Sequence, residues 1–192
     1  MQALVVSSSL DEKSLSEELG RRYVVALRAN GVEAEFVSLK EYLLPRFDNG
    51  DGISADTSYQ ALHPLILEAD GLVLASPVYN WGCCAELKRF VEVIGTTPPD
   101  GSLRGAFFDK VVTFVSAGGL PHSYMSIGSM AISMMFDFKC VINPYHVYVY
   151  GEQWQDGELR EDASSRLDKS AAVMDELMRS LSQRTYRSNW EV

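Results

Sequence analysis

Long apolar runs and cysteines are scarce in this chain of 192 residues. No apolar run approaches the roughly 18 residues that span a bilayer, which argues against an integral membrane protein. Met1 and Gln2 carry no positive cluster, and residues 3–6 are too short for the apolar core of a signal peptide, so we expect a cytoplasmic protein. The three cysteines include the neighbours Cys83 and Cys84, which would form a disulfide only with strain, so we expect reduced thiols.

Positive charge is also limited, because 17 Lys and Arg residues face 26 Asp and Glu residues, for a net charge of -9. This balance argues against a nucleic-acid partner, whose binding depends on clustered basic side chains. The chain has neither G-x-G-x-x-G nor G-x-x-x-x-G-K-[ST], so we expect no dinucleotide grip of the Rossmann type and no nucleoside triphosphate hydrolysis. His63, His122 and His146 lack metal-ligand spacing, and we predict no metal site.

Apolar strand patterns alternate with helical patterns along the whole chain. The strand patterns cover residues 3–6, 32–39, 71–74, 111–115 and 141–149, the last interrupted by Asn143-Pro144. The helical patterns cover residues 15–27, 58–70, 85–94, 125–136 and 164–181. This alternation predicts an α/β fold with a parallel sheet covered on both faces, and the absence of a linker predicts one domain over residues 1–192.

The most informative segment, residues 75–94, joins an apolar strand, a Pro-Tyr-Asn loop and an amphipathic helix. Loops at the carboxyl ends of parallel strands are where open α/β sheets bind ligands. Pro77 fixes one backbone dihedral, and Asn80 tolerates unusual ones, so the loop can offer backbone groups to a flat aromatic ligand. The turns after the first and fourth strands, residues 7–16 and 116–119, should emerge at the same edge and meet this loop.

The first of these turns reads S-S-S-L-D-E-K-S-L-S and opens a helix with several hydroxyls. Free N–H groups and the helix dipole at such a position favour a phosphate. Taken alone, the simpler interpretation is that Ser14 caps the helix, with Glu17 at capping-box spacing.

In sequence, the turn resembles the phosphate loop of the NADPH-dependent FMN reductase family, G-S-x-R-x-x-S-x-x-x-x-L. Ser9, Ser14 and Leu19 match in register, whereas Ser8 stands in place of Gly and Asp11 in place of Arg. Asp11 and Glu12 would repel a phosphate unless they face solvent or Lys13 offsets them.

The other two turns carry the same resemblance. P-V-Y-N followed by Leu87-Lys88 is similar to the family's P-x-Y-N and L-K, and S-A-G-G at residues 116–119 is similar to S-x-G-G. The resemblance implies a flavodoxin-like three-layer sandwich with five parallel strands in the order 2-1-3-4-5. It also implies FMN as cofactor and NADPH or NADH as co-substrate. The residues implied to bind FMN are Ser7, Ser9, Ser14, Ser16, Pro77, Val78, Tyr79, Asn80, Ser116, Gly118 and Gly119.

The function implied is hydride transfer from NADPH or NADH to a small acceptor such as a quinone or free flavin, by a ping-pong mechanism. Because a flavin accepts the hydride itself, no catalytic side chain is expected. Two alternatives are an electron-carrying flavodoxin, although residues 7–14 do not match the flavodoxin T-x-T-G-x-T loop, and a flavin-free interaction protein on the same scaffold. Trp81 fits either a buried core position or an aromatic wall or dimer contact, and Cys83 and Cys84 fit apolar filler better than a redox pair.

The apolar segment at residues 130–136 suggests association with a second copy. A helix that is apolar on most sides needs burial beyond its own sheet, so we expect a homodimer or a dimer of dimers. A deeply buried core helix is the alternative.

Overall fold

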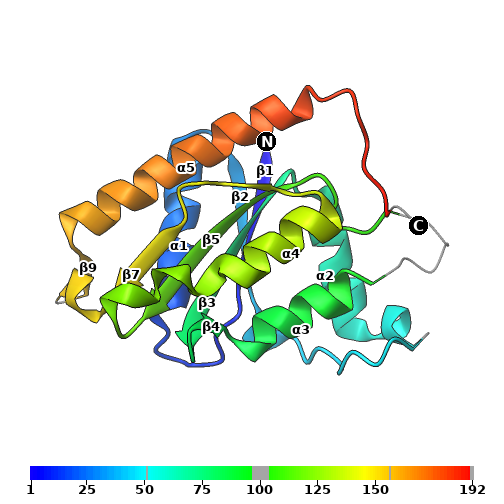
Figure 1. Ribbon diagram of the computed structural model, residues 1–192, viewed down its shortest axis with the longest axis horizontal. Helices are drawn as coiled ribbons and strands as arrows, with labels where there is room; N and C mark the ends of the chain where they lie inside the picture. Colours follow the sequence, from blue (N-terminus) through cyan, green and yellow to red (C-terminus); the bar gives the residue numbers. More distant parts are fainter. Residues whose placement is uncertain (51, 97–103, 156, 191–192) are drawn as a thin grey trace.

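A twisted parallel sheet forms the centre of the computed structural model, which describes residues 1–50, 52–96, 104–155 and 157–190 (Figure 1). The strand order is β2-β1-β3-β5, continued beside β5 by β6 and β7. The strands are β1 (Gln2–Ser7), β2 (Glu33–Ser38), β3 (Gly71–Tyr79), β5 (Val111–Gly118), β6 (Val141–Ile142) and β7 (Val147–Tyr150). The predicted order 2-1-3-4-5 is confirmed, with the fifth strand divided into β6 and β7.

Five α-helices cover the two faces of this sheet. They are α1 (Leu15–Ala29), α2 (Thr57–Glu68), α3 (Ala85–Ile94), α4 (Gly128–Phe138) and α5 (Glu161–Ser182). Figure 1 shows α2, α3 and α4 over one face, where Phe90, Phe107 and Phe114 are fully buried. Helices α1 and α5 cover the other face, where Tyr23 and Leu27 are fully buried. The two apolar clusters account for the three layers, because each sheet face must be shielded from water.

The division between β6 and β7 has a buried polar cause. Asn143 lies in the break and its Nδ2 donates hydrogen bonds to Thr113 Oγ1 and to the carbonyl of Ser170, each at 3.0 Å. The Ser170 hydroxyl is also 2.9 Å from the hydroxyl of Tyr23. These bonds join α1, β5 and α5, so the interruption in the strand pairs polar groups that would otherwise be buried without partners.

The Pro-Tyr-Asn segment corrects the sequence prediction of an irregular loop. Strand β3 continues to Tyr79 and turns back as a hairpin with β4 (Gly82–Cys83), in which Val78 faces Cys83 and Tyr79 faces Gly82. Pro77 is compatible with this strand because its fixed dihedral is close to extended backbone.

Several short elements were outside the sequence prediction. The segment before α4 is a tighter helix of the 3-10 type, Pro121–Ile127, so the predicted single helix at residues 125–136 is divided at Gly128. Two further short strands, β8 (Trp154–Gln155) and β9 (Glu158–Leu159), form a hairpin. Further 3-10 segments are Leu39–Glu41, Ile53–Ala55 and Gly151–Gln153. None of the helices in the described part of the chain is both long and apolar enough to cross a membrane.

Candidate functional site

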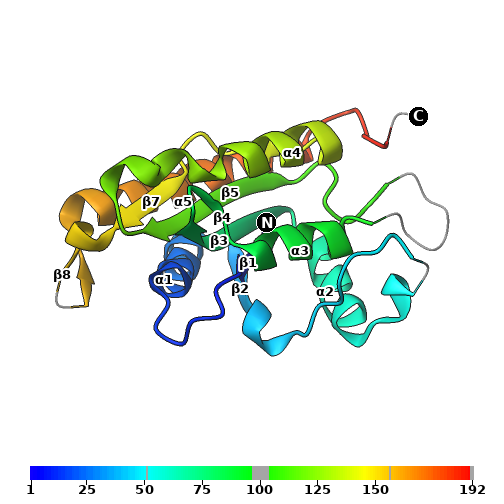
Figure 2. The ribbon, with the colours of Figure 1, turned by 60° about the horizontal axis from the view of Figure 1, so that its bottom comes forward.

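The three predicted loops begin side by side at the carboxyl edge of the sheet. Strand β3 lies between β1 and β5, with Ser7 in register with Ala75 and Ser76 in register with Ser116. The backbone N–H of Ser8 donates to the Ala75 carbonyl at 2.9 Å, which ties the first loop to β3. Figure 2 shows the first loop and the β3–β4 hairpin at the same end of the molecule. The fold therefore brings together segments that lie far apart in the sequence.

The first loop ends in a well-formed helix cap. Ser14 is the N-cap of α1, and its Oγ accepts a hydrogen bond from the Glu17 N–H at 3.1 Å and lies 3.0 Å from Ser16 Oγ. The capping interpretation of Ser14 is confirmed. It does not exclude a phosphate, because the other N–H groups of the first helical turn have no acceptor within the helix.

The other serines of this loop differ in what they can offer to a ligand. Ser9 Oγ accepts from the Asp11 N–H at 3.2 Å and is buried, as is Ser16. The Ser7 side chain is fully buried, and its Oγ has no hydrogen-bond partner within the described residues. Ser8 Oγ donates to the Ala75 carbonyl at 3.0 Å. Ser14 is half-buried and thus the hydroxyl of this group nearest to solvent.

Charges around this loop are balanced by a residue that sequence reasoning missed. Lys40, which follows the carboxyl end of β2, forms ion pairs with Glu17 at 2.9 Å and with Glu12 at 3.8 Å, and donates to the Asp11 carbonyl at 3.2 Å. Asp11 and Glu12 are exposed, so they face solvent as one expectation required. The cation beside them is Lys40 and not Lys13. Lys40 could have been found from the sequence, because residues that follow the carboxyl ends of parallel strands lie at the ligand-binding edge of the sheet.

Glu17 is the most enclosed carboxylate at the helix start. Burial raises its pKa, but hydrogen bonds from Lys40 and Arg21 outweigh burial, so its pKa lies below the ordinary value. Arg21 Nη2 lies 2.8 Å from the same carboxylate. Two cations thus offset one negative charge, and the helix start keeps its affinity for an anion.

The hairpin presents backbone and aromatic groups at the same edge. Pro77 and Val78 are half-buried, whereas Tyr79 and Asn80 are exposed. Trp81 has 60% of its surface exposed, so the buried-core interpretation is wrong. Its ring centroid lies 5.3 Å from that of His122, in the Pro121–Ile127 segment that follows the third loop. This pairing of distant residues has no signal in the sequence.

The third loop includes a glycine that the packing requires. A Cβ on Gly118 would lie 2.6 Å from the hydroxyl of Tyr148, which also donates a hydrogen bond to the Leu120 carbonyl. A Cβ on Gly119 would have no neighbour within 4 Å, so the backbone here is open to a ligand. Ser116 is buried, and its Oγ donates to the Val147 carbonyl at 3.4 Å, so its side chain holds β7.

The cysteines near this edge have a structural setting. Cys84 is buried, and its Sγ lies 3.2 Å from Ser8 Oγ. Burial, together with the neighbouring Cys84, raises the pKa of Cys83 to about 11. A thiol that stays protonated at neutral pH is a poor nucleophile, which disfavours a redox role. Among the described residues, no three His, Cys, Asp or Glu side chains are placed to hold a metal ion.

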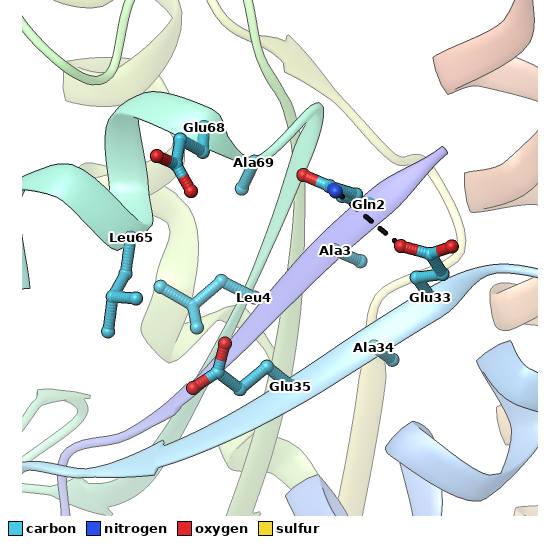
Figure 3. Close-up of a pocket in the computed structure, with 9 residues that line it drawn as sticks. All are labelled: Gln2, Ala3, Leu4, Glu33, Ala34, Glu35, Leu65, Glu68 and Ala69. Atoms are coloured by element: carbon cyan, nitrogen blue, oxygen red, sulfur yellow. Dashed lines mark hydrogen bonds between the residues drawn. The ribbon is translucent and has the colours of Figure 1, made fainter.

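The residues present fit an FMN molecule. The start of α1 offers N–H groups and hydroxyls for a phosphate, the hairpin offers exposed backbone, and Gly119 leaves open space. A separate pocket of about 220 Å³ (Figure 3) lies where β1 and β2 begin, the opposite edge from these loops. Its lining includes Glu33, Glu35 and Glu68, and this acidic surface is unsuited to a phosphate.

Comparison with known proteins gives a consistent result. A family model described as NADPH-dependent FMN reductase matches residues 1–155. An NADPH azoreductase of Bacillus sp. (strain OY1-2) is 31% identical over 149 residues, covering 76% of this chain and 78% of the relative.

Solved structures share the fold at low sequence identity. An NADH:FMN oxidoreductase in its apo form superposes with a TM-score of 0.75 at 16% identity, covering 96% of this chain and 91% of the other. The flavoenzyme NAD(P)H:(acceptor) oxidoreductase of Paracoccus denitrificans gives 0.70 at 16% identity, covering 95% and 97%.

Proposed function

Because this chain belongs to the NADPH-dependent FMN reductase family, it is an NAD(P)H-dependent oxidoreductase with FMN as cofactor, and we propose that it reduces small aromatic acceptors by a ping-pong mechanism. The acceptors are quinones, free flavin or, as the name of the Bacillus relative suggests, azo compounds. With a quinone, NADPH, one proton and the quinone give NADP⁺ and the hydroquinone.

The observation that carries this proposal is that the three loops begin side by side at the carboxyl edge of the sheet. Bound FMN supplies the chemistry, since its ring takes up two electrons as hydride and releases them to an acceptor. The protein chain binds the cofactor and orients it toward the substrates. The N–H groups at the start of α1 would hold the phosphate, and Pro77, Val78, Tyr79 and Asn80 would contact the ring.

The order of substrate binding follows from the shared surface. The sequence has a site for one mononucleotide and no separate dinucleotide fingerprint, so nicotinamide and acceptor would use the same space, framed by Tyr79, Asn80 and Gly118. The nicotinamide product must then leave before the acceptor enters. We also infer a homodimer or dimer of dimers, and a cytoplasmic location where NADPH and NADH are supplied.

An anaerobic titration of the purified yellow protein tests the proposal. We expect NADPH or NADH to bleach the flavin in rapid mixing at least as fast as turnover, and steady-state double-reciprocal lines to be parallel. If neither nucleotide bleaches the flavin at that rate while dithionite does, the chain is an electron carrier of the flavodoxin type. A colourless protein that binds no added FMN would favour an interaction protein.

A further inference from the structure

The β3–β4 hairpin holds a tryptophan in an unfavourable backbone conformation. Its two-residue turn consists of Asn80, with φ of 50°, and Trp81, with φ of 64°. Two-residue hairpin turns of this kind need positive φ at both positions, where Asn and Gly are the usual residues. A bulky side chain is rarely found there, and such strain is retained mostly where it serves function.

Packing does not explain this residue. The Trp81 side chain is mostly exposed, and its ring meets His122 at an interplanar angle of 33°. His122 lies in the Pro121–Ile127 turn after β5, and the Cys83 thiol approaches the Ser126 carbonyl of that turn at 3.9 Å. The His122 ring thus packs against the indole, and the Cys83–Ser126 contact ties the hairpin to the Pro121–Ile127 segment, at the sheet edge proposed for FMN.

Exposed apolar side chains are frequent on the hairpin and on the segment that follows β5. They are Tyr79, Trp81, Leu120, Tyr124 and Met125, each 50% to 61% exposed. Side chains of this kind cannot form an ion pair with a phosphate. They suit an uncharged planar ring, which gains from stacking on an aromatic face.

We propose that Trp81, braced by His122, is a specificity-determining contact that stacks on planar aromatic acceptors, and this inference rests on the proposed function. Trp81 transfers neither electron nor proton. It adds binding energy that a quinone or azo ring can use and a small inorganic oxidant cannot. NADPH has ribose and phosphate groups for its own binding, so the loss of one aromatic contact should affect the acceptor most.

The test compares Trp81→Gly with Trp81→Tyr in the FMN-loaded protein. Trp81→Gly removes the ring while giving the turn its preferred Asn-Gly sequence, so hairpin folding is preserved. Trp81→Tyr keeps an aromatic ring. Tyr186→Ala, at an exposed aromatic in the C-terminal segment, is the control and should behave as wild type.

We expect Trp81→Gly to raise the KM for menadione about tenfold, with Trp81→Tyr close to wild type, since loss of a stacking contact typically has this effect. Ferricyanide reduction, in which one NADPH reduces two ferricyanide ions, should change less than about twofold. The rate of flavin bleaching by NADPH should be equally unaffected. His122→Ala should also raise the KM for menadione, by a smaller factor.

Three results would overturn the inference. If Trp81→Gly lost equal activity with menadione and with ferricyanide, or if NADPH bleached its flavin more slowly, Trp81 would be assigned to FMN or nicotinamide binding. An unchanged menadione KM would remove it from the site. Failure of the proposed function looks different, because then the wild-type flavin itself would not be bleached by NADPH or NADH.

Discussion

At the scale of single residues, Ser14 separates helix capping from phosphate binding. Its hydroxyl caps α1 through the Glu17 N–H. Ser14→Asp keeps a good cap but places negative charge beside the phosphate, and Ser14→Asn keeps the cap without charge. We expect Ser14→Asp to weaken FMN binding about tenfold or more and Ser14→Asn far less, because like charges at close range repel strongly. Quenching of flavin fluorescence measures both. Equal affinities in the two variants would place the phosphate elsewhere.

The two glycines of the third loop give a second prediction at this scale. Gly118→Ala places a Cβ against the Tyr148 hydroxyl, so it should lower both the free energy of unfolding and FMN affinity. Gly119→Ala adds a Cβ in open space, so the free energy of unfolding of the FMN-free protein should fall by less than about 0.5 kcal/mol. If the ring lies here, FMN affinity should still fall severalfold. Urea unfolding and FMN titration of both variants check this. Unchanged FMN affinity in Gly119→Ala would show that the flavin ring does not lie beside Gly119.

At the scale of elements, a buried carboxylate, Asp109, helps to attach the C-terminal segment to the rest of the fold. Asp109 lies beside the start of β5 and forms ion pairs with Arg104 at 3.1 Å and Arg184 at 3.5 Å, and it accepts the Ser188 N–H at 3.1 Å. Burial raises the pKa of Asp109, but the Ser188 hydrogen bonds and the two arginines outweigh burial and hold its pKa below the ordinary value of 3.8. Its ionised form therefore stabilises the fold.

Asp109→Asn should reduce the free energy of unfolding by about 2 kcal/mol at neutral pH, since it leaves two arginines beside a neutral group. Asn tolerates the positive φ of 59° at this position, so the backbone is a minor factor. Because the pKa is depressed on folding, the contribution is complete above pH 3.8 and is lost as the pH falls below it. Urea unfolding at pH 7 and pH 3 measures the difference. If the difference in the free energy of unfolding between wild type and Asp109→Asn were the same at both pH values, the prediction would be contradicted.

At the scale of the whole molecule, α4 offers a surface for association. Ile132, Met135 and Phe136 are exposed at 54%, 41% and 67%, while Met130 and Met134 of the same helix are buried. The alternative of a deeply buried core helix therefore holds for only one side of α4. Exposed apolar clusters of this kind are typical of contact surfaces.

We predict that the protein sediments as a dimer or tetramer at micromolar concentration and that Phe136→Glu shifts it toward monomer. Val25→Glu is the control, because Val25 is 67% exposed on α1, away from this surface. A wild-type monomer at and above micromolar concentration would reject the prediction.

Apolar periodicity was enough to predict the alternating strands and helices and a parallel sheet covered on both faces, because this periodicity is local. The strand order 2-1-3-4-5 was implied by the family resemblance. The sequence also located the helix cap at Ser14 and the three loops, since turn residues and caps act within a few positions of the chain. The FMN-binding residues are implied by the family resemblance and are tested by the Ser14 and Gly119 variants, and the single domain stays a prediction.

Contacts between residues that are far apart in the chain are seen only in the folded structure. The hairpin form of Tyr79–Gly82, the pairing of Trp81 with His122 and the role of Lys40 beside Glu17 join residues whose separation along the chain carries no periodic signal. The same holds for Gly118, because a side chain at this position would collide with Tyr148 of a neighbouring strand. Local propensity fixes elements, but contacts between elements depend on packing in three dimensions, which a pattern in one dimension does not contain.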